Sequence, residues 1–227
     1  MNKITTVGLT FVALSVALAG CSPSNEQSAA DTTESTSSAA AAPTESADYP
    51  ELESATLNQY IVDNDIAETP FADGDPGTPK IEFPIPDGWS SAGDDTPDWA
   101  FGAIKYDNPV DPEDPPAVIA IASKLTGDVD PAKILEYAPG QLDGLPGFEP
   151  IGEPEKDLLG GFEAIDYVGT YMWEGKKRIV GQQTIVIPGK DALFVLQLNG
   201  DALDGQQDVV IDAADVIAEQ TKITLPS

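Results

Sequence analysis

Apolar and polar residues alternate most regularly between residues 161 and 198. Three runs carry this pattern: GFEAIDYVGTYMW, KRIVGQQTIVI and ALFVLQL. A two-residue period is typical of β-strands, and short glycine-bearing connections between such runs indicate antiparallel hairpins. Residues 174–176 and 188–191 provide these connections, so we expect three long antiparallel strands.

The first of these strands is apolar on both of its faces. Its alternation places Ile165, Tyr167, Tyr171 and Trp173 on one face and Phe162, Ala164, Val168 and Met172 on the other. A sheet with one solvated face alternates more cleanly between apolar and polar side chains. We therefore expect either helices on both faces of the sheet or a cavity on one of them.

Shorter patterns predict the other elements of the fold. Helices are expected at residues 56–66, 130–138 and 208–220, and strands at 80–89, 99–106 and 117–125. In the second helix Asp130 is the expected N-cap and Pro131 occupies the first turn, while Pro139 ends or kinks it. The prolines within the first of these strands favour a sheet edge. The prediction is an α+β fold, with a mostly antiparallel, twisted sheet and helices packed on it.

The amino-terminal residues are typical of an export signal. Lys3 is the only charge before an apolar stretch at residues 7–20, which is shorter than the ~20 residues that cross a bilayer. The next feature, LAGC at residues 18–21, resembles the bacterial lipobox, in which a diacylglyceryl group joins the cysteine sulfur before cleavage ahead of that cysteine. We expect a lipoprotein signal peptide at 1–20 and lipidation at Cys21. The alternative is an ordinary secreted protein with one stray cysteine.

The amino-acid composition changes at two points after this segment. Residues 22–48 are dominated by Ser, Thr, Ala and acidic residues and contain no aromatic or basic side chain. Such a stretch buries too little apolar surface to offset its ordering entropy, so we expect residues 21–48 to be a lipidated, disordered tether. Aromatic residues and apolar runs begin near Tyr49, and residues 49–227 are expected to form a single α+β domain.

The net charge and the absence of histidine and of nucleotide-binding motifs exclude several classes of function. The formal net charge is −28, which disfavours nucleic acid and anionic lipid head groups as ligands. The sequence has no histidine, which removes the usual general base and the commonest transition-metal ligand. It also has no Walker A loop, no G-x-S-x-G elbow and no G-x-G-x-x-G. We therefore expect no catalytic residue and no cofactor.

Two oxygen-rich stretches are candidates for a calcium site. Residues 94–98 (DDTPD) and 107–116 (DNPVDPEDPP) carry several carboxylates. Neither has the spacing or the central glycine of an EF-hand loop, and their prolines favour solvated loops. No metal site is therefore predicted.

Four stretches resemble a known family. They are GDPGTPKIEFPIPDGW (74–89), TPDWAFGAIKY (96–106), PPAVIAIASKLTGDVDPAKILEYAPGQLDGLPGF (115–148) and TIVIPGKDALFVLQLNGDA (184–202). They look like the LpqN/LpqT lipoproteins of mycolate-bearing actinobacteria, and the likeness covers nearly all of residues 56–224. The resemblance implies a Mog1/PsbP-like fold, a curved antiparallel sheet between helices. It also implies an accessory role in building the mycolate outer layer, by binding acylated trehalose or by partnering its transport and transfer proteins. Cys21 is the only functional residue that the resemblance transfers.

The favoured hypothesis is a non-catalytic binding module, lipid-anchored on the extracytoplasmic face of the cell membrane, that holds a glycolipid, an envelope protein, or both. Its candidate ligand-binding residues are Trp89, Trp99, Tyr106, Tyr167, Tyr171 and Trp173. For each of them the alternative is packing in the core. Two other functions stay open: a protein-interaction lipoprotein, either a scaffold or host-directed, with no small ligand, and a histidine-free hydrolase with two acids in a cleft.

Overall fold

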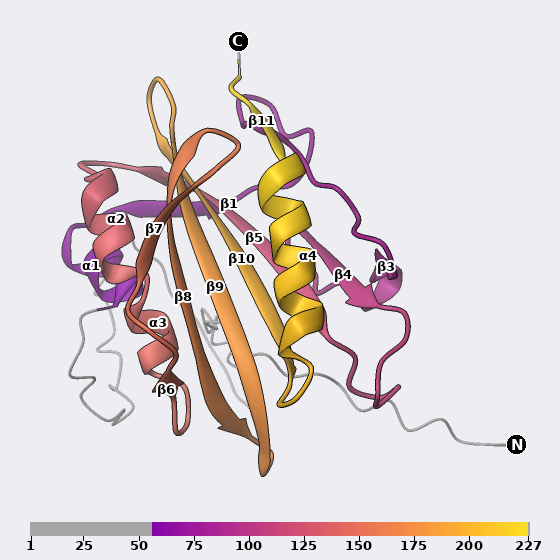
Figure 1. The fold of residues 1–227 in the computed structure, drawn as a ribbon. Coiled ribbons are helices and arrows are strands. Elements are labelled where there is room, and N and C mark those ends of the chain that lie inside the picture. The colour runs from indigo at the N-terminus through magenta and orange to yellow at the C-terminus, as the bar shows by residue number, and fades with distance from the viewer. Residues whose placement is uncertain (1–55, 227) are drawn as a thin grey trace, which may run out of the picture. The chain divides into compact units, whose positions relative to one another are not determined.

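The three alternating runs form the centre of the sheet in the computed structural model, which describes residues 56–226 (Figure 1). They are β8 (Phe162–Trp173), β9 (Lys176–Pro188) and β10 (Leu193–Leu203). All three pair antiparallel, as predicted, with Trp173 opposite Lys176 across a two-residue turn. Glu174 and Gly175 both adopt positive φ, 51° and 77°, which is the geometry of a tight hairpin turn.

The remaining strands extend this sheet on both sides. The order is β3-β4-β5-β10-β9-β8-β6, with β1 also paired to β5 and β7 to β8, and every pair is antiparallel. Their bounds are β1 (Ala67–Pro70), β3 (Trp89–Ser91), β4 (Gly102–Tyr106), β5 (Ala117–Thr126), β6 (Glu149–Pro150) and β7 (Glu155–Leu159). A separate two-stranded sheet joins β2 (Lys80–Glu82) to β11 (Lys222–Thr224). The main sheet is open, with β3 and β6 at the two ends of its order.

One face of the sheet is covered by α4 (Gln207–Gln220). The helix buries Val210, Ala213 and Ile217, which lie three or four residues apart and form its apolar stripe. It approaches β10 closely, because a Cβ added to Gly200 would lie 2.6 Å from Val210 Cγ1. Behind it lies the larger apolar core, which includes Ile185, Leu196 and Leu198.

The opposite face carries α1 (Leu57–Asp63), α2 (Pro131–Tyr137) and the short α3 (Gly140–Asp143). Asp130 caps α2 as predicted, its carboxylate accepting from the Ala132 amide at 2.9 Å. Leu57 and Ile61 of α1 pack with Ile134 of α2 against the sheet. The expectation of helices on both faces, and of an α+β fold with a mostly antiparallel sheet, is confirmed. No helix among residues 56–226 is long and apolar enough to span a membrane.

Several boundaries differ from the prediction, and each difference has a local cause. The strand expected at 80–89 ends at Glu82, because Pro84 and Pro86 remove two ladder donors, and pairing resumes only at Trp89. The strand expected at 99–106 begins at Gly102, after a turn in which the Ala100 amide donates to the Pro97 carbonyl. The short strands β1, β6, β7 and β11 were not predicted. They have too few residues to show a period, and the partners of β1 and β11 are distant in sequence.

Candidate functional site

A hollow lies on the α4 face, beside α4 and over β4 and β5. It is an apolar cleft of about 340 Å³. Its wall comes from the loop after β2 (Phe83, Pro84, Ile85), from the region around β3 and β4 (Ser91, Thr96, Phe101, Gly102, Ala103, Ile104) and from the core (Val118, Ala120, Leu198, Ile217). Residues from five segments of the chain, between Phe83 and Ile217, therefore build one cleft.

Local sequence explains why this cleft exists. Pro84 and Pro86 prevent the 83–88 segment from pairing, so it runs as a loop whose Phe83 packs edge-on against Phe101, with ring centroids 6.2 Å apart. Gly102 lies opposite Ala120 in the ladder, and a Cβ added to it would meet nothing within 4 Å. A bare backbone beside an alanine leaves a hollow where two larger side chains would close it.

The side chains that line the cleft are almost all apolar. Apart from backbone, its polar groups are the hydroxyls of Ser91 and Thr96, and Ser91 Oγ already accepts from the Gly93 amide at 3.2 Å. Ile85 at the loop is 57% exposed. The volume is in the range of small-molecule sites, which are typically apolar with few polar groups. No charged side chain lines it, so it suits an alkyl or acyl chain and offers nothing for acid–base catalysis.

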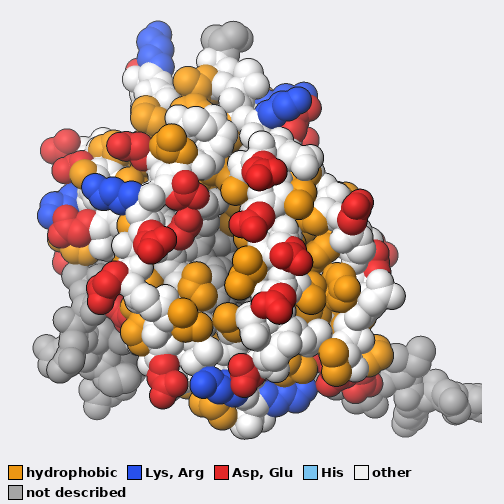
Figure 2. Space-filling model, viewed as in Figure 1, with side chains coloured by type: hydrophobic (Ala, Val, Ile, Leu, Met, Phe, Trp, Pro, Cys, Tyr) orange, Lys and Arg blue, Asp and Glu red, His pale blue; other side chains and the backbone are white. Residues whose placement is uncertain are grey.

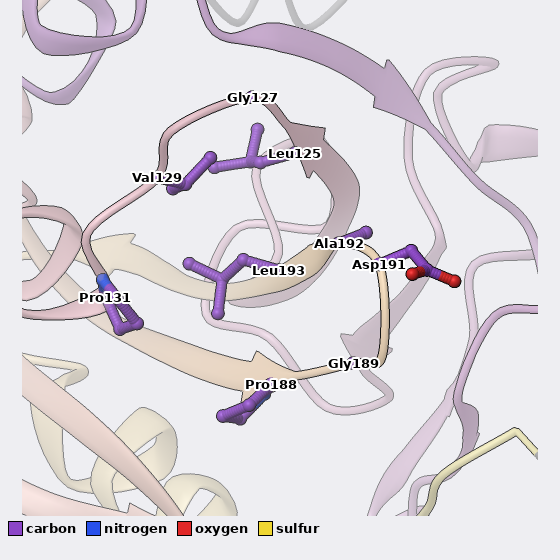
Figure 3. A pocket seen from close by; sticks show the side chains of 9 residues that line it. All are labelled: Leu125, Gly127, Val129, Pro131, Pro188, Gly189, Asp191, Ala192 and Leu193. Atoms are coloured by element: carbon purple, nitrogen blue, oxygen red, sulfur yellow. The ribbon is translucent and has the colours of Figure 1, made fainter.

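A second, smaller pocket of about 240 Å³ lies where the end of β5 and the start of α2 meet the β9–β10 turn (Figure 3). Leu125, Val129 and Leu193 point inward, and Asp191 points away from its centre. The rest of its lining is proline, glycine and alanine. It presents no group that would orient a ligand.

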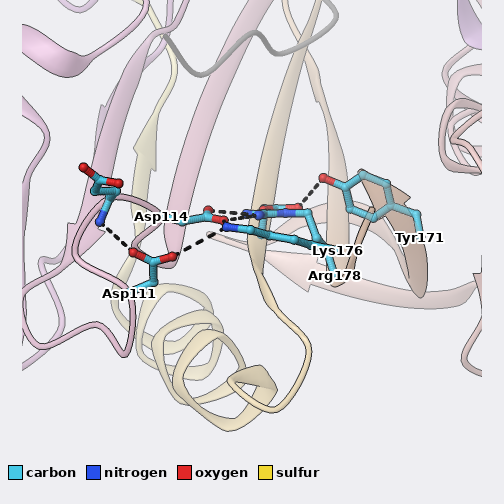
Figure 4. A network of polar contacts seen from close by, with 7 residues as sticks. Asp111, Asp114, Tyr171, Lys176 and Arg178 are labelled. Atoms are coloured by element: carbon cyan, nitrogen blue, oxygen red, sulfur yellow. Dashed lines mark hydrogen bonds and ion pairs between the residues drawn. The ribbon is translucent and has the colours of Figure 1, made fainter. Parts of the chain in front are cut away.

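The face opposite α4 holds a buried ion network instead (Figure 4). Arg178 Nε donates to Asp201 Oδ1 at 2.7 Å, and Nη2 donates to the same oxygen. Its Nη1 donates to both oxygens of Asp114, at 2.9 and 2.8 Å. Tyr171 donates its hydroxyl to Asp201 Oδ2 at 2.7 Å, and Lys176 Nζ lies 3.1 Å from Asp114 Oδ2. The network thus fastens the 107–116 loop to β9 and β10.

Electrostatics lock the protonation states in this network. Burial opposes the charge of Arg178, but its hydrogen bonds to Asp201 and Asp114 hold its pKa above the ordinary value. Burial alone would raise the pKa of Asp114, yet the donors of Arg178 and Lys176 outweigh it and the pKa is lowered. Burial and the neighbouring Asp201 raise the pKa of Tyr171 above its ordinary 10, so its hydroxyl stays a donor. These shifts keep Arg178 charged, Asp114 ionised and Tyr171 protonated near neutral pH, whereas burial raises the pKa of Asp201.

The oxygen-rich loops considered for calcium are engaged with cations of the protein. Asp114 pairs with Arg178, and Asp111 lies 3.5 Å from Lys176. In the other loop Asp95 pairs with Lys105 at 2.8 Å. Over residues 56–226 no group of three or more possible metal-ligating side chains occurs.

The six predicted ligand-binding aromatics do not form one site. Trp89 and Tyr106 pack together on the α4 face, with centroids 5.7 Å apart. Tyr167, Tyr171 and Trp173 lie on the opposite face, where Tyr167 and Tyr171 are buried. Trp99 is 39% exposed in the loop before β4. None of the six lines the apolar cleft, although Trp89 and Tyr106 share β3 and β4 with its residues Ser91 and Ile104. Cys21 lies outside the described residues.

The cleft residues were missed, and one signal could have found some of them. In FPIP, Phe83 and Ile85 alternate with prolines that forbid a central strand. Large apolar side chains on a loop that cannot pair must pack over another element, and that describes the cleft wall. No comparable signal marks Gly102 or Leu198, because their shared location follows from strand order alone.

Comparison with known proteins gives a consistent result. Residues 53–224 match the family model described as "Probable lipoprotein LpqN". The lipoprotein LpqN of Mycobacterium tuberculosis is 52% identical over 169 residues, which are 74% of each chain. A crystal structure of LpqN involved in cell envelope biogenesis of M. tuberculosis matches with a TM-score of 0.72 and 51% identity, covering 76% of this chain and 99% of that one.

A more distant likeness reaches the Saccharomyces cerevisiae Ran-binding protein Mog1p, at 12% identity and a TM-score of 0.41 over 69% of this chain and 94% of that one. It is too remote to support any conclusion about function. The LpqN matches, in contrast, cover nearly the whole described domain at about half identity, and no catalytic name occurs among them. The chain belongs to the LpqN lipoprotein family.

Proposed function

We propose that this protein is a non-catalytic lipoprotein of cell-envelope biogenesis that binds the acyl chain of a trehalose glycolipid. The observation that carries the proposal is the apolar cleft beside α4, which has an exposed isoleucine at its loop and no charged lining. The solved relative is described as involved in cell envelope biogenesis, which supports the same setting. The 1–20 signal peptide, the lipidated Cys21 and the 21–48 tether belong to the proposal. They would hold the domain on the extracytoplasmic side of the cell membrane.

The test uses the full chain, a trehalose monoester and free trehalose. We expect the ester to raise the melting temperature and the free sugar to leave it unchanged, because the cleft takes the alkyl part. Native mass spectrometry should show the ester retained one to one. No thermal shift and no retained ester would contradict the proposal.

Two variants locate the binding. Gly102→Phe places a ring in open space inside the cleft and should reduce ester binding at least about tenfold, since it occupies the volume that the chain needs. Ile85→Asp places a charge at the loop and should weaken binding as well. Val110→Asp is the control, because Val110 is 83% exposed in the 107–116 loop. Equal loss in all three variants would place the ester elsewhere.

A further inference from the structure

The α4 face has a second region, on the other side of α4 from the apolar cleft. α4 packs on β10 and leaves part of β8 and β9 uncovered, as Figure 1 shows between α4 and β7. We call this region the sheet strip, defined by Val168, Met172, Ile179 and Gly181. Met172 is 42% exposed and the other three residues are partly exposed. A Cβ added to Gly181 would meet only Val168, at 3.6 Å, whereas its ladder partner Gly200 lies directly under α4.

Acidic side chains flank the sheet strip on both sides. Exposed carboxylates follow α4, and others project from β7, with hydrophobic side chains between the two rows (Figure 2). The α4 row is Asp208, Asp212, Asp215 and Glu219, and the β7 row is Glu155 and Asp157. None of these six carboxylates forms an ion pair with a lysine or arginine of residues 56–226. On the same face Lys177 pairs with Glu149 instead, at 3.7 Å.

Two like charges face each other where β7 pairs with β8. Asp166 of β8 lies directly opposite Glu155 of β7 in the ladder, on the same face as the sheet strip. Like charges in directly opposed positions destabilise an antiparallel pair. Asp166 Oδ1 is buried and has no hydrogen-bond partner, and burial together with Asp157 and Glu155 raises the pKa of Asp166 to about 6. A cation placed beside these carboxylates would relieve the repulsion between them.

We propose that the sheet strip is a docking surface for a basic, amphipathic segment of another protein. Its apolar side chains would cover the strip, and its lysines or arginines would meet the carboxylates of β7 and α4. Charge complementarity excludes nucleic acid and anionic membranes as occupants, because both would be repelled. A bare cation would leave the apolar strip uncovered, and the described residues offer no metal cluster.

The test measures binding of a fluorescent 13-residue peptide of alternating lysine and leucine to the full chain, by anisotropy at two salt concentrations. Oligolysine of the same charge and a glutamate–leucine peptide are the comparison probes. We expect the lysine–leucine peptide to bind at least about tenfold more tightly than oligolysine, and its affinity to fall with salt. Equal affinity for both basic probes would mean diffuse attraction to an acidic chain and would overturn the proposal.

Matched variants locate the surface. The triple change E155Q/D157N/D166N should weaken the lysine–leucine peptide at least about tenfold. The triple E68Q/D73N/D128N removes the same charge from exposed acids elsewhere and should change affinity less than about threefold. Equal losses in the two triples would overturn the proposal.

A further pair does not depend on the buried Asp166. Met172→Lys puts a cation on the exposed part of the sheet strip and should weaken the peptide about tenfold, while Val110→Lys should not. If Met172→Lys has no effect, the strip is not the site. If Gly102→Phe abolishes peptide binding, the peptide occupies the apolar cleft, and that result also overturns the proposal. Because ester binding is measured separately, failure of one proposal is distinguishable from failure of the other.

Discussion

Both faces of the central sheet hold a buried apolar cluster, but the face opposite α4 also holds buried side chains that hydrogen-bond to one another. Over β4, β5 and β10 the α4 face is packed by apolar side chains under a single helix, and a cleft remains beside it. The other face carries three short helices over its own apolar cluster, together with two separate sets of bonded polar groups. In one, Gln197 Nε2 donates to Gln141 Oε1 at 2.6 Å, and the other is the Arg178 network. Apolar contacts are non-directional and tolerate a leftover volume, whereas buried polar groups require fixed partners. The contrast predicts that the polar face responds mainly to the loss of a charge and the α4 face mainly to a change of volume.

The sharpest way to break this contrast is to remove the cation that the polar face depends on. Arg178→Met leaves Asp114 and Asp201 buried without their partner, and we expect the free energy of unfolding to fall by about 3–5 kcal/mol. Chemical denaturation measures the change. Lys105→Met is the control, since its pair with Asp95 is exposed and contributes at most about 1 kcal/mol. A loss of similar size in both variants would mean that the buried network does not secure this face.

The α4 face should respond to volume rather than to charge. Gly200→Ala places a methyl group 2.6 Å from Val210 Cγ1 and forces α4 away from β10, at a cost of about 1–3 kcal/mol in unfolding free energy. Gly181→Ala, at the paired position outside the helix contact, should change stability by less than about 1 kcal/mol. Thermal unfolding of both variants tests the prediction. If the two glycines respond alike, α4 does not sit tightly on β10.

The smallest effect concerns the one carboxylate of the α4 face whose pKa is strongly raised. The pKa of Asp166 is about 6 in the folded chain against its ordinary 3.8, so the folded state binds a proton more tightly than the unfolded state. The contribution of Asp166 to stability should therefore rise as pH falls from about 6 to about 4, whereas above pH 6 the folded chain carries the charged form at a cost in stability. Asp166→Asn should stabilise by about 1 kcal/mol at pH 7.5, allowing for solvent screening, and by almost nothing below pH 4.

Unfolding at pH 7.5 and pH 4 measures this difference. Asp128→Asn, on an exposed turn, should change stability by no more than about 0.5 kcal/mol at either pH. An Asp166→Asn effect that is the same at both pH values would show that the carboxylate is not strained by its neighbours.

Sequence reasoning reached the parts of this fold whose signals are local. The alternation of β8, the cap of α2 by Asp130 and the helical period of α4 all reside in stretches of consecutive residues. The cleft and the Arg178 network do not. Asp114 and Arg178 are 64 residues apart, and nothing near either one indicates the other. The six aromatics show the same limit, because alternation assigns a side chain to a face but not to a neighbour.

Gly102 has an evolutionary consequence. Gly102 has no side chain and faces open space, so one substitution there would change the volume of the apolar cleft while the surrounding packing stays intact. Under the acyl-binding function proposed above, relatives that carry alanine, valine or leucine there would have progressively shallower clefts, and the acyl chains that they prefer should shorten in the same order.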